Sequence, residues 1–147
     1  HTHNHEFKYI YISEEAFWDN FNKHQNFLKE VTGKDCTIFR FPGGSHNTLV
    51  RNAHGSSFTE NIILKLNEQG INCYDWNVDS GDAKGNNIPA ATIYNNVVKE
   101  SRDKNGELKS PAIVLMHDCM TKTTTVEALP KIIQYFKEQG YKFDTLN

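Results

Sequence analysis

At 147 residues, the chain is long enough for one domain, or most of one, with a substantial buried core. Hydrophobic residues make up 37% of it and aromatic residues 12%, which excludes an intrinsically disordered chain. The net charge of −2 gives no reason to expect a nucleic acid or a membrane surface as a partner, and no apolar run approaches the roughly 20 residues of a membrane span.

The first five residues carry three imidazoles, at His1, His3 and His5. Histidine is the commonest metal-binding side chain in proteins, and its neutral ring nitrogens suit zinc, iron, cobalt and nickel. His1 and His5 are four positions apart, so on a helical turn they would share one face. A purification tag or a frayed polar end is the alternative interpretation, although Thr2 and Asn4 interrupt the histidines. Spacing alone leaves both interpretations open.

Hydrophobic periodicity and turn residues predict four helices that alternate with four strands. Ser13 has the side chain of a helix N-cap, and Ser57 with Glu60 has the spacing of a capping box. Gly33 and Gly70 end the first two helices. The predicted helices span 13–33, 57–70, 89–98 and 126–139, and the predicted strands span 36–41, 71–78, 112–116 and 141–146.

This regular alternation predicts an α/β fold in a single domain, with parallel strands joined by crossover helices. An open doubly wound sheet and a β/α barrel both fit the pattern. In either architecture, polar residues at the C-terminal ends of the strands are the candidates for function.

Polar side chains do follow three of the predicted strands. The first strand ends in Arg40, the second in Asp79 and Asp82, and the third in His117. Because the carboxyl ends of parallel strands meet at one edge of a sheet, we expect these groups at one rim, beside the opening histidines. Each also has a simpler interpretation: a surface arginine, two turn aspartates, and a buried core histidine. Arg40 lies in an apolar strand, however, where its charge requires a carboxylate partner.

The chemistry that these groups suit is metal-assisted hydrolysis. Two histidine ligands and a carboxylate leave open positions on a divalent metal for water and substrate. A carboxylate can take the proton of that water, a backbone N–H in a glycine loop can stabilise the oxyanion, and a second histidine can protonate the leaving group. A serine nucleophile is disfavoured because the chain has no GxSxG elbow. Gly43-Gly44 is not a phosphate loop, because no GxGxxG or GxxxxGKS pattern follows it.

The order and spacing of these groups resemble the polysaccharide deacetylases with a NodB homology domain, which form carbohydrate esterase family four. The resemblance extends from His1 to the last predicted strand, and it implies a distorted (β/α) barrel. The family's His-(Ser/Thr)-x-x-His motif matches the first five residues, which implies His1 and His5 as metal ligands. It also implies a divalent metal, with zinc as the first candidate and cobalt, nickel or iron as alternatives.

The resemblance also implies roles for the first glycine loop. In the family's third motif, an arginine holds the catalytic base, and a backbone N–H after a proline lies in the oxyanion hole. Arg40, Pro42, Gly43 and Gly44 match this motif. The commoner version has tyrosine after the proline, where this chain has Gly43. The backbone N–H survives that change, but an aromatic wall of the substrate groove is lost.

The later motifs supply the acid side of the reaction. The fourth motif, Asp-x-x-Asp-Trp, matches Asp79 to Asp82, with Ala83 in place of the tryptophan. The fifth motif is an apolar strand that ends in histidine, and it matches Leu115 to His117. The resemblance makes His117 the general acid, with Asp82 as the carboxylate that tunes it.

One motif of the family has no match. Its first motif, Thr-Phe-Asp-Asp, carries the catalytic base and the third metal ligand, and the sequence 74–76, Tyr-Asp-Trp, lies in the wrong place for it. The chain starts with His1 and not with Met, so we expect a processed or partial sequence. The resemblance then implies the C-terminal part of one deacetylase domain, residues 1–147. It lacks the first strand and helix, and its partner is the missing N-terminal segment.

The function implied by the resemblance is metal-dependent removal of the N-acetyl group from N-acetylglucosamine in a polysaccharide, either peptidoglycan or a chitin-like polymer. The sequence 40–45, Arg-Phe-Pro-Gly-Gly-Ser, is similar to that of peptidoglycan deacetylases of Gram-positive bacteria. Such enzymes work outside the membrane, so we expect an extracellular or cell-surface location, with a signal or anchor upstream. An acetyl-xylan esterase of the same family and an inactive carbohydrate-binding fragment are the alternatives.

Overall fold

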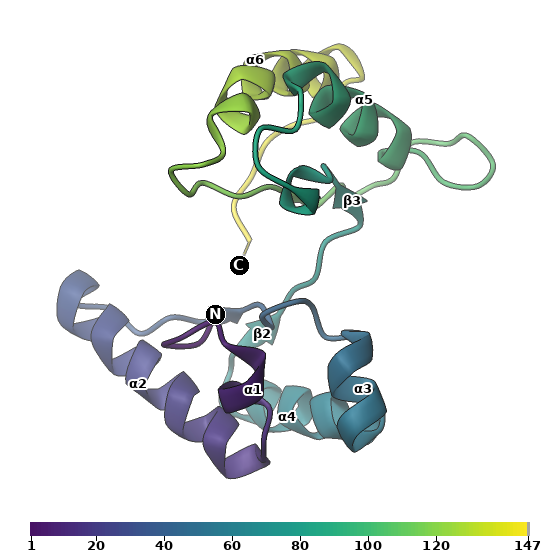
Figure 1. Ribbon diagram of the computed structural model, residues 1–147. Coiled ribbons are helices and arrows are strands. Elements are labelled where there is room, and N and C mark those ends of the chain that lie inside the picture. Colours follow the sequence, from purple (N-terminus) through teal and green to yellow (C-terminus); the bar gives the residue numbers. More distant parts are fainter. Residues whose placement is uncertain (147) are drawn as a thin grey trace. The chain divides into compact units, whose positions relative to one another are not determined.

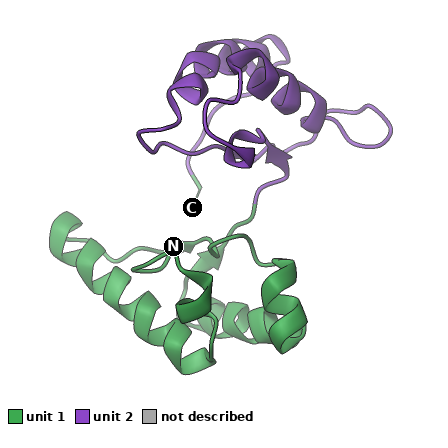
Figure 2. Cartoon of the chain, in the orientation of Figure 1, with its two compact units in different colours: residues 1–75, 146–147 green, residues 76–145 purple. Residues whose placement is uncertain are grey.

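The computed structural model describes residues 1–146, which form two compact units (Figure 2). The first unit contains residues 1–75 with Leu146, and the second contains residues 76–145. Each unit has one pair of parallel strands joined by a crossover that includes helix (Figure 1). The predicted parallel pairing with helical crossovers is therefore confirmed within each unit.

The first unit is built on the β1–β2 pair, in which Phe39 lies beside Cys73. Its elements in chain order are α1 (Phe7–Ile10), α2 (Glu14–Thr32), β1 (Ile38–Phe39), α3 (Thr48–His54), α4 (Ser57–Glu68) and β2 (Asn72–Cys73). The long helix α2 forms where the sequence predicts it. The hydroxyl of Ser13 accepts a hydrogen bond from the Ala16 N–H, and Gly33 ends the helix in the left-handed region.

The core of the first unit is aromatic. Phe17 and Phe21 of α2 pack against Phe39, and Phe17 also packs against Phe41, with ring centroids 5.4–5.8 Å apart. All four rings are at most 2% exposed. The core therefore joins the buried face of α2 to β1 and to the residue that leads into the glycine loop.

The second unit is built on the β3–β4 pair, in which Asp79 lies beside Leu115. Its elements in chain order are β3 (Val78–Asp79), the 3-10 helix η1 (Asp82–Lys84), α5 (Ala90–Glu100), β4 (Val114–Leu115) and α6 (Thr123–Glu138). Helices α5 and α6 pack together, and their apolar side chains bury Val78. Pro130 lies in the interior of α6, which begins at Thr123, three residues before the predicted start at residue 126.

Three predicted elements differ from the structure. The single strand predicted over 71–78 is two strands, β2 and β3, which pair with different partners in different units. The strand predicted over 141–146 is absent from that described segment, which has no ladder partner. The helix α3 was not predicted. Asn47 nucleates it by accepting hydrogen bonds from the N–H groups of Leu49 and Val50.

The predicted capping box at Ser57 is also wrong. Ser57 is already inside α4, and Ser56 precedes it with φ −69° and ψ −31°, a helical conformation. An N-cap hydroxyl reaches the N–H groups of the first turn from an extended backbone, so Ser56 makes no such bond. Among the described residues, no helix has the length and apolar character needed to cross a membrane.

We expect Phe17→Ala to lower the free energy of unfolding by about 3–5 kcal/mol, because the variant leaves a cavity among three other buried rings. Urea titration followed by circular dichroism measures this loss. Phe27→Ala on the same helix is the control, since Phe27 is 53% exposed, and it should change the value by less than about 0.5 kcal/mol. Equal losses in the two variants would contradict the assignment of the core.

Candidate functional site

His1 and His5 lie close together although residues 1–5 are not helical. Their ring centroids are 5.3 Å apart with the planes at 90°. The segment is held on α2, because Asn20 accepts hydrogen bonds from the backbone N–H groups of His3 and Asn4. The two imidazoles are thus brought together by a loop that packs on α2. The helical turn suggested by their spacing is not formed.

Arg40 contacts His1 at both ring nitrogens. Nδ1 of His1 lies 2.6 Å from the Arg40 carbonyl oxygen, and Nη2 of Arg40 lies 2.9 Å from Nε2 of His1. A carbonyl oxygen only accepts and a guanidinium only donates. Nδ1 of His1 therefore carries the hydrogen, and Nε2 carries the lone pair.

The two imidazoles fit the donor set of a metal site. Rings bound to one zinc ion at about 2.0–2.1 Å have centres roughly 5 Å apart, close to the observed separation. A ring N–H held by a backbone carbonyl is the usual support of a metal-bound histidine. The guanidinium of Arg40 donates a hydrogen bond to Nε2 of His1, the nitrogen that a metal would bind. Within residues 1–146, no three His, Cys, Asp or Glu side chains gather as a metal site, so His1 and His5 stay a predicted pair of ligands.

The loop from Pro42 to Ser45 is held at both ends. The hydroxyl of Tyr11 donates to the Pro42 carbonyl oxygen at 2.9 Å, and burial raises the pKa of Tyr11, which keeps it a donor. The Gly44 N–H donates to Phe41 and the Ser45 N–H donates to Asp75. Of the three N–H groups after the proline, only that of Gly43 has no hydrogen-bond partner within residues 1–146.

Gly43 is required by this loop. Its φ of +77° is disfavoured for residues with a side chain. An added Cβ would lie 2.3 Å from Nδ2 of Asn47 and 2.6 Å from the Phe7 ring. The tyrosine that the commoner motif has at this position therefore does not fit this loop.

Asp75 is a site residue that the sequence analysis missed. Its carboxylate accepts hydrogen bonds from the Ser45 N–H at 3.1 and 3.2 Å, and from the Ser45 hydroxyl. It thereby holds the far end of the glycine loop. Asp75 lies two residues after the end of β2. The rule that polar residues gather where strands end could have found it, had the end of that strand been predicted at the right residue.

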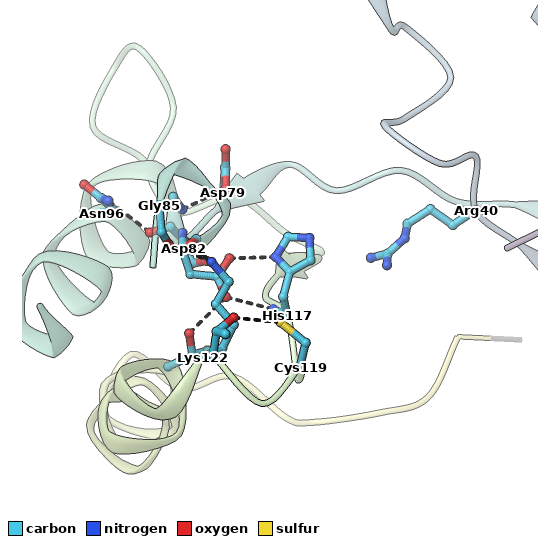
Figure 3. A network of polar contacts seen from close by, with 12 residues as sticks. Arg40, Asp79, Asp82, Gly85, Asn96, His117, Cys119 and Lys122 are labelled. Atoms are coloured by element: carbon cyan, nitrogen blue, oxygen red, sulfur yellow. Dashed lines mark hydrogen bonds and ion pairs between the residues drawn. The ribbon is translucent and has the colours of Figure 1, made fainter. Parts of the chain in front are cut away.

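In the second unit, Asp82 and His117 form a hydrogen-bonded pair (Figure 3). Nδ1 of His117 lies 2.7 Å from Oδ1 of Asp82, and the His117 backbone N–H donates to Oδ2 at 2.8 Å. The hydroxyl of Thr125 also donates to Oδ2, at 3.0 Å. Asp82 is 1% exposed, whereas the His117 side chain is 39% exposed. The arrangement leaves Nε2 of His117 as the ring nitrogen that Asp82 does not engage.

Two opposing effects act on the pKa of Asp82. Burial raises it, but the hydrogen bonds from the His117 ring, the His117 backbone and Thr125 together outweigh burial, so the pKa lies below its ordinary value of 3.8. A buried carboxylate that stays ionised can fix the orientation of a histidine and stabilise its protonated form. This electrostatic arrangement suits a proton donor.

Asp79 has a different environment. Its carboxylate accepts the Gly81 N–H at 2.8 Å, which closes the turn between β3 and η1. No hydrogen bond joins it to His117 within the described residues. The structure therefore brings Asp82 and His117 together, and it places Asp79 in the adjacent turn.

The predicted site residues form two clusters, one in each unit. The cluster of the first unit contains His1, His5, Arg40 and the loop 42–44, and the cluster of the second unit contains Asp79, Asp82 and His117. Thr125 and Lys122 at the start of α6 belong to the second cluster, and the sequence analysis missed both. Nothing in the local sequence marks them, since they reach Asp82 only through the packing of α6.

Comparison with known proteins relates the chain to a family and to several of its members. A polysaccharide deacetylase family profile matches residues 1–71. A peptidoglycan-N-acetylglucosamine deacetylase of Bacillus cereus is 29% identical over 148 residues, which cover 98% of this chain and 48% of that protein. The chain thus spans about half the length of this relative.

Two solved structures are similar over nearly the whole chain. The catalytic domain of peptidoglycan N-acetylglucosamine deacetylase from Eubacterium rectale is 32% identical with a TM-score of 0.80, and the match covers 97% of this chain and 61% of that one. A CE4 esterase of Streptococcus mutans is 29% identical with a TM-score of 0.82, covering 100% of this chain and 61% of that one. These likenesses confirm the predicted (β/α) fold.

We expect Asp82→Asn to weaken the dependence of stability on acid pH. The lowered pKa means that the unfolded chain binds a proton at Asp82 more readily than the folded chain does. The stabilisation from this carboxylate is therefore present above about pH 4 and is lost as the pH falls through the folded-state pKa. Urea unfolding at several pH values between about 7 and 3 measures the effect.

The exposed neighbour Asp118 supplies the matched control. Asp118→Asn should keep the acid dependence of the original chain, because this carboxylate is exposed to solvent. An unchanged acid dependence in Asp82→Asn would show that the Asp82 hydrogen bonds do not favour the ionised form.

Proposed function

Because the chain belongs to the polysaccharide deacetylase family, we propose that the whole protein hydrolyses the N-acetyl group of N-acetylglucosamine residues in peptidoglycan or a related polysaccharide. Water adds to the amide carbonyl carbon, and the C–N bond then breaks to release acetate and the free amine. The observation that carries the proposal is the Asp82–His117 pair, in which a buried carboxylate engages Nδ1 of the histidine. This contact supports a role for the histidine as the acid that protonates the leaving amine.

We assign His117 as the general acid. Asp82 accepts the hydrogen of Nδ1, so the proton for the amine comes from Nε2 of the imidazolium. The negative charge of Asp82 stabilises that imidazolium. The partial exposure of the His117 side chain supports access of the substrate to this nitrogen.

We assign the Gly43 N–H as a donor to the oxyanion. It is the N–H of the loop without a partner in the described chain, and Tyr11 and Asp75 hold the loop on either side of it. A donor held in place before the reaction stabilises the developing charge without reorganisation. A side chain at position 43 would collide with Asn47 and Phe7, so in this loop glycine keeps the N–H in place.

We propose that His1 and His5 hold a divalent metal, with zinc as the first candidate. When bound, the metal lowers the pKa of a water molecule and polarises the substrate carbonyl. The His1 ring is prepared for this role by the Arg40 carbonyl, which fixes its tautomer. Metal binding at Nε2 requires the Arg40 guanidinium to move from its position on His1.

The proposal also requires a base and a third metal ligand. The chain spans 61% of the two solved relatives, and we propose that another segment of the same domain supplies both groups. A peptidoglycan substrate places the reaction at the cell surface, and this supports an extracellular location for the whole protein. The substrate class rests on the names of two relatives, each a peptidoglycan deacetylase.

We expect His117→Ala in the whole protein to lower kcat by about a hundredfold or more, because the amine then leaves without a positioned acid. Acetate release from peptidoglycan and from N-acetylglucosamine oligomers measures the activity, with acetylated xylan as the competing substrate. His54→Ala is the control, since His54 is exposed on α3, and it should retain full activity. Preference for acetylated xylan would overturn the substrate class. Full activity of His117→Ala would overturn the acid role.

We expect His5→Ala to lose both bound metal and activity, since the two remaining ligands, His1 and the one from the other segment, hold a divalent ion weakly. Elemental analysis of the dialysed whole protein measures the metal. His3→Ala is the matched control, because His3 is exposed and lies between the two proposed ligands. Unchanged metal content in His5→Ala would remove His5 from the ligand set.

A further inference from the structure

The start of α6 supplies two side chains that converge on Asp82. The Thr125 hydroxyl donates to Oδ2 of the Asp82 carboxylate at 3.0 Å. The Lys122 ammonium donates to the Asp82 backbone carbonyl oxygen at 2.6 Å, and both of these residues are labelled in Figure 3. Thr125 is 5% exposed and Lys122 is 9% exposed. These residues lie forty or more positions from Asp82 in sequence, so only the packing of α6 creates the contact.

Lys122 hydrogen-bonds to backbone carbonyl groups around Asp82 and does not pair with the carboxylate as a counter-charge. Its second hydrogen bond goes to the Gly85 carbonyl oxygen at 2.7 Å. The two acceptors flank η1, so one ammonium holds both ends of the turn that carries Asp82. Burying an ammonium group is unfavourable in free energy unless its hydrogens are bonded, so these contacts hold Lys122 in place as well as the turn.

Thr125 completes the hydrogen bonding of the carboxylate. Oδ1 of Asp82 accepts from the His117 ring, and Oδ2 accepts from both the His117 backbone and Thr125. With donors on both oxygens, from two different elements, the carboxylate cannot rotate about its last bond without losing hydrogen bonds. Its lone pairs therefore stay aimed at Nδ1 of His117.

We propose that Thr125 is a positioning residue for the reaction and that Lys122 supports it, both acting through Asp82. Thr125 fixes the plane of the Asp82 carboxylate, which keeps the hydrogen of neutral His117 on Nδ1 and directs Nε2 toward the leaving group. Lys122 fixes the turn from which Asp82 projects. The role in catalysis rests on the proposed function of His117, but the effect on the His117 tautomer does not.

The test compares Thr125→Val with Thr125→Ser in the chain of residues 1–147. Valine keeps the shape of threonine and removes its hydroxyl, whereas serine restores the hydroxyl. The 15N chemical shifts of the ring nitrogens report which nitrogen of neutral His117 carries the hydrogen. We expect Thr125→Val to move the population from the Nδ1–H tautomer toward the Nε2–H tautomer, and Thr125→Ser to keep the original shifts.

Thr123→Val is the matched control, because Thr123 is exposed in the same turn of α6. It should leave the His117 shifts unchanged. If Thr125→Val does not fold, Thr125→Cys replaces it, since a thiol fills the space but donates weakly, and it should give an intermediate tautomer population. Original shifts in the folded valine or cysteine variant would overturn the proposal.

Kinetics of the whole protein provide the second measurement. We expect Thr125→Val to lower kcat about tenfold with KM changed by less than about twofold, and Thr125→Ser to restore kcat. A merely structural role would lower the amount of folded enzyme and not change its pH-independent kcat per active site. If the whole protein has no deacetylase activity, the proposed function fails, while the nitrogen shifts still decide the role of Thr125.

Discussion

The second unit depends on one buried carboxylate. Asp82 lies in η1, but its hydrogen bonds reach His117, two residues after β4, and the first turn of α6. Removing this group from water is unfavourable unless donors replace the lost hydration, and three donors do so here. The same contacts orient His117, so the interaction that stabilises the unit also prepares its chemistry.

The first unit solves a different problem, that of holding a glycine loop in one conformation. A loop with a positive φ at Gly43 has many alternatives in the unfolded chain and gains little from packing of its own. Tyr11 and Asp75 restrain it from opposite ends, and Phe41 anchors its start in the aromatic core. The core thus has two functions, because it stabilises the unit and positions the loop.

Elements that depend on interactions within one segment could be predicted from the sequence, whereas elements that depend on distant partners could not. The helix α2 was predicted well, since its cap, its buried stripe and its final glycine all lie within one segment. The prediction failed over 71–78, where the segment predicted as one strand divides between two sheets. No local pattern records such a division, because it depends on which partner each half meets.

The same limit applies to the candidate site, because sequence patterns report only on residues that are close together in the chain. The pattern of strand ends in the sequence was sufficient to select Arg40, Asp82 and His117, and motif order related them to a family that the comparisons support. The resemblance already implied that Asp82 acts on His117, and the structure supplied the hydrogen bonds between them. Only the tertiary structure placed Arg40 against His1 and revealed Asp75, Lys122 and Thr125. Residue type and spacing are properties of the chain, whereas a hydrogen bond across forty residues exists only after helices and strands have packed.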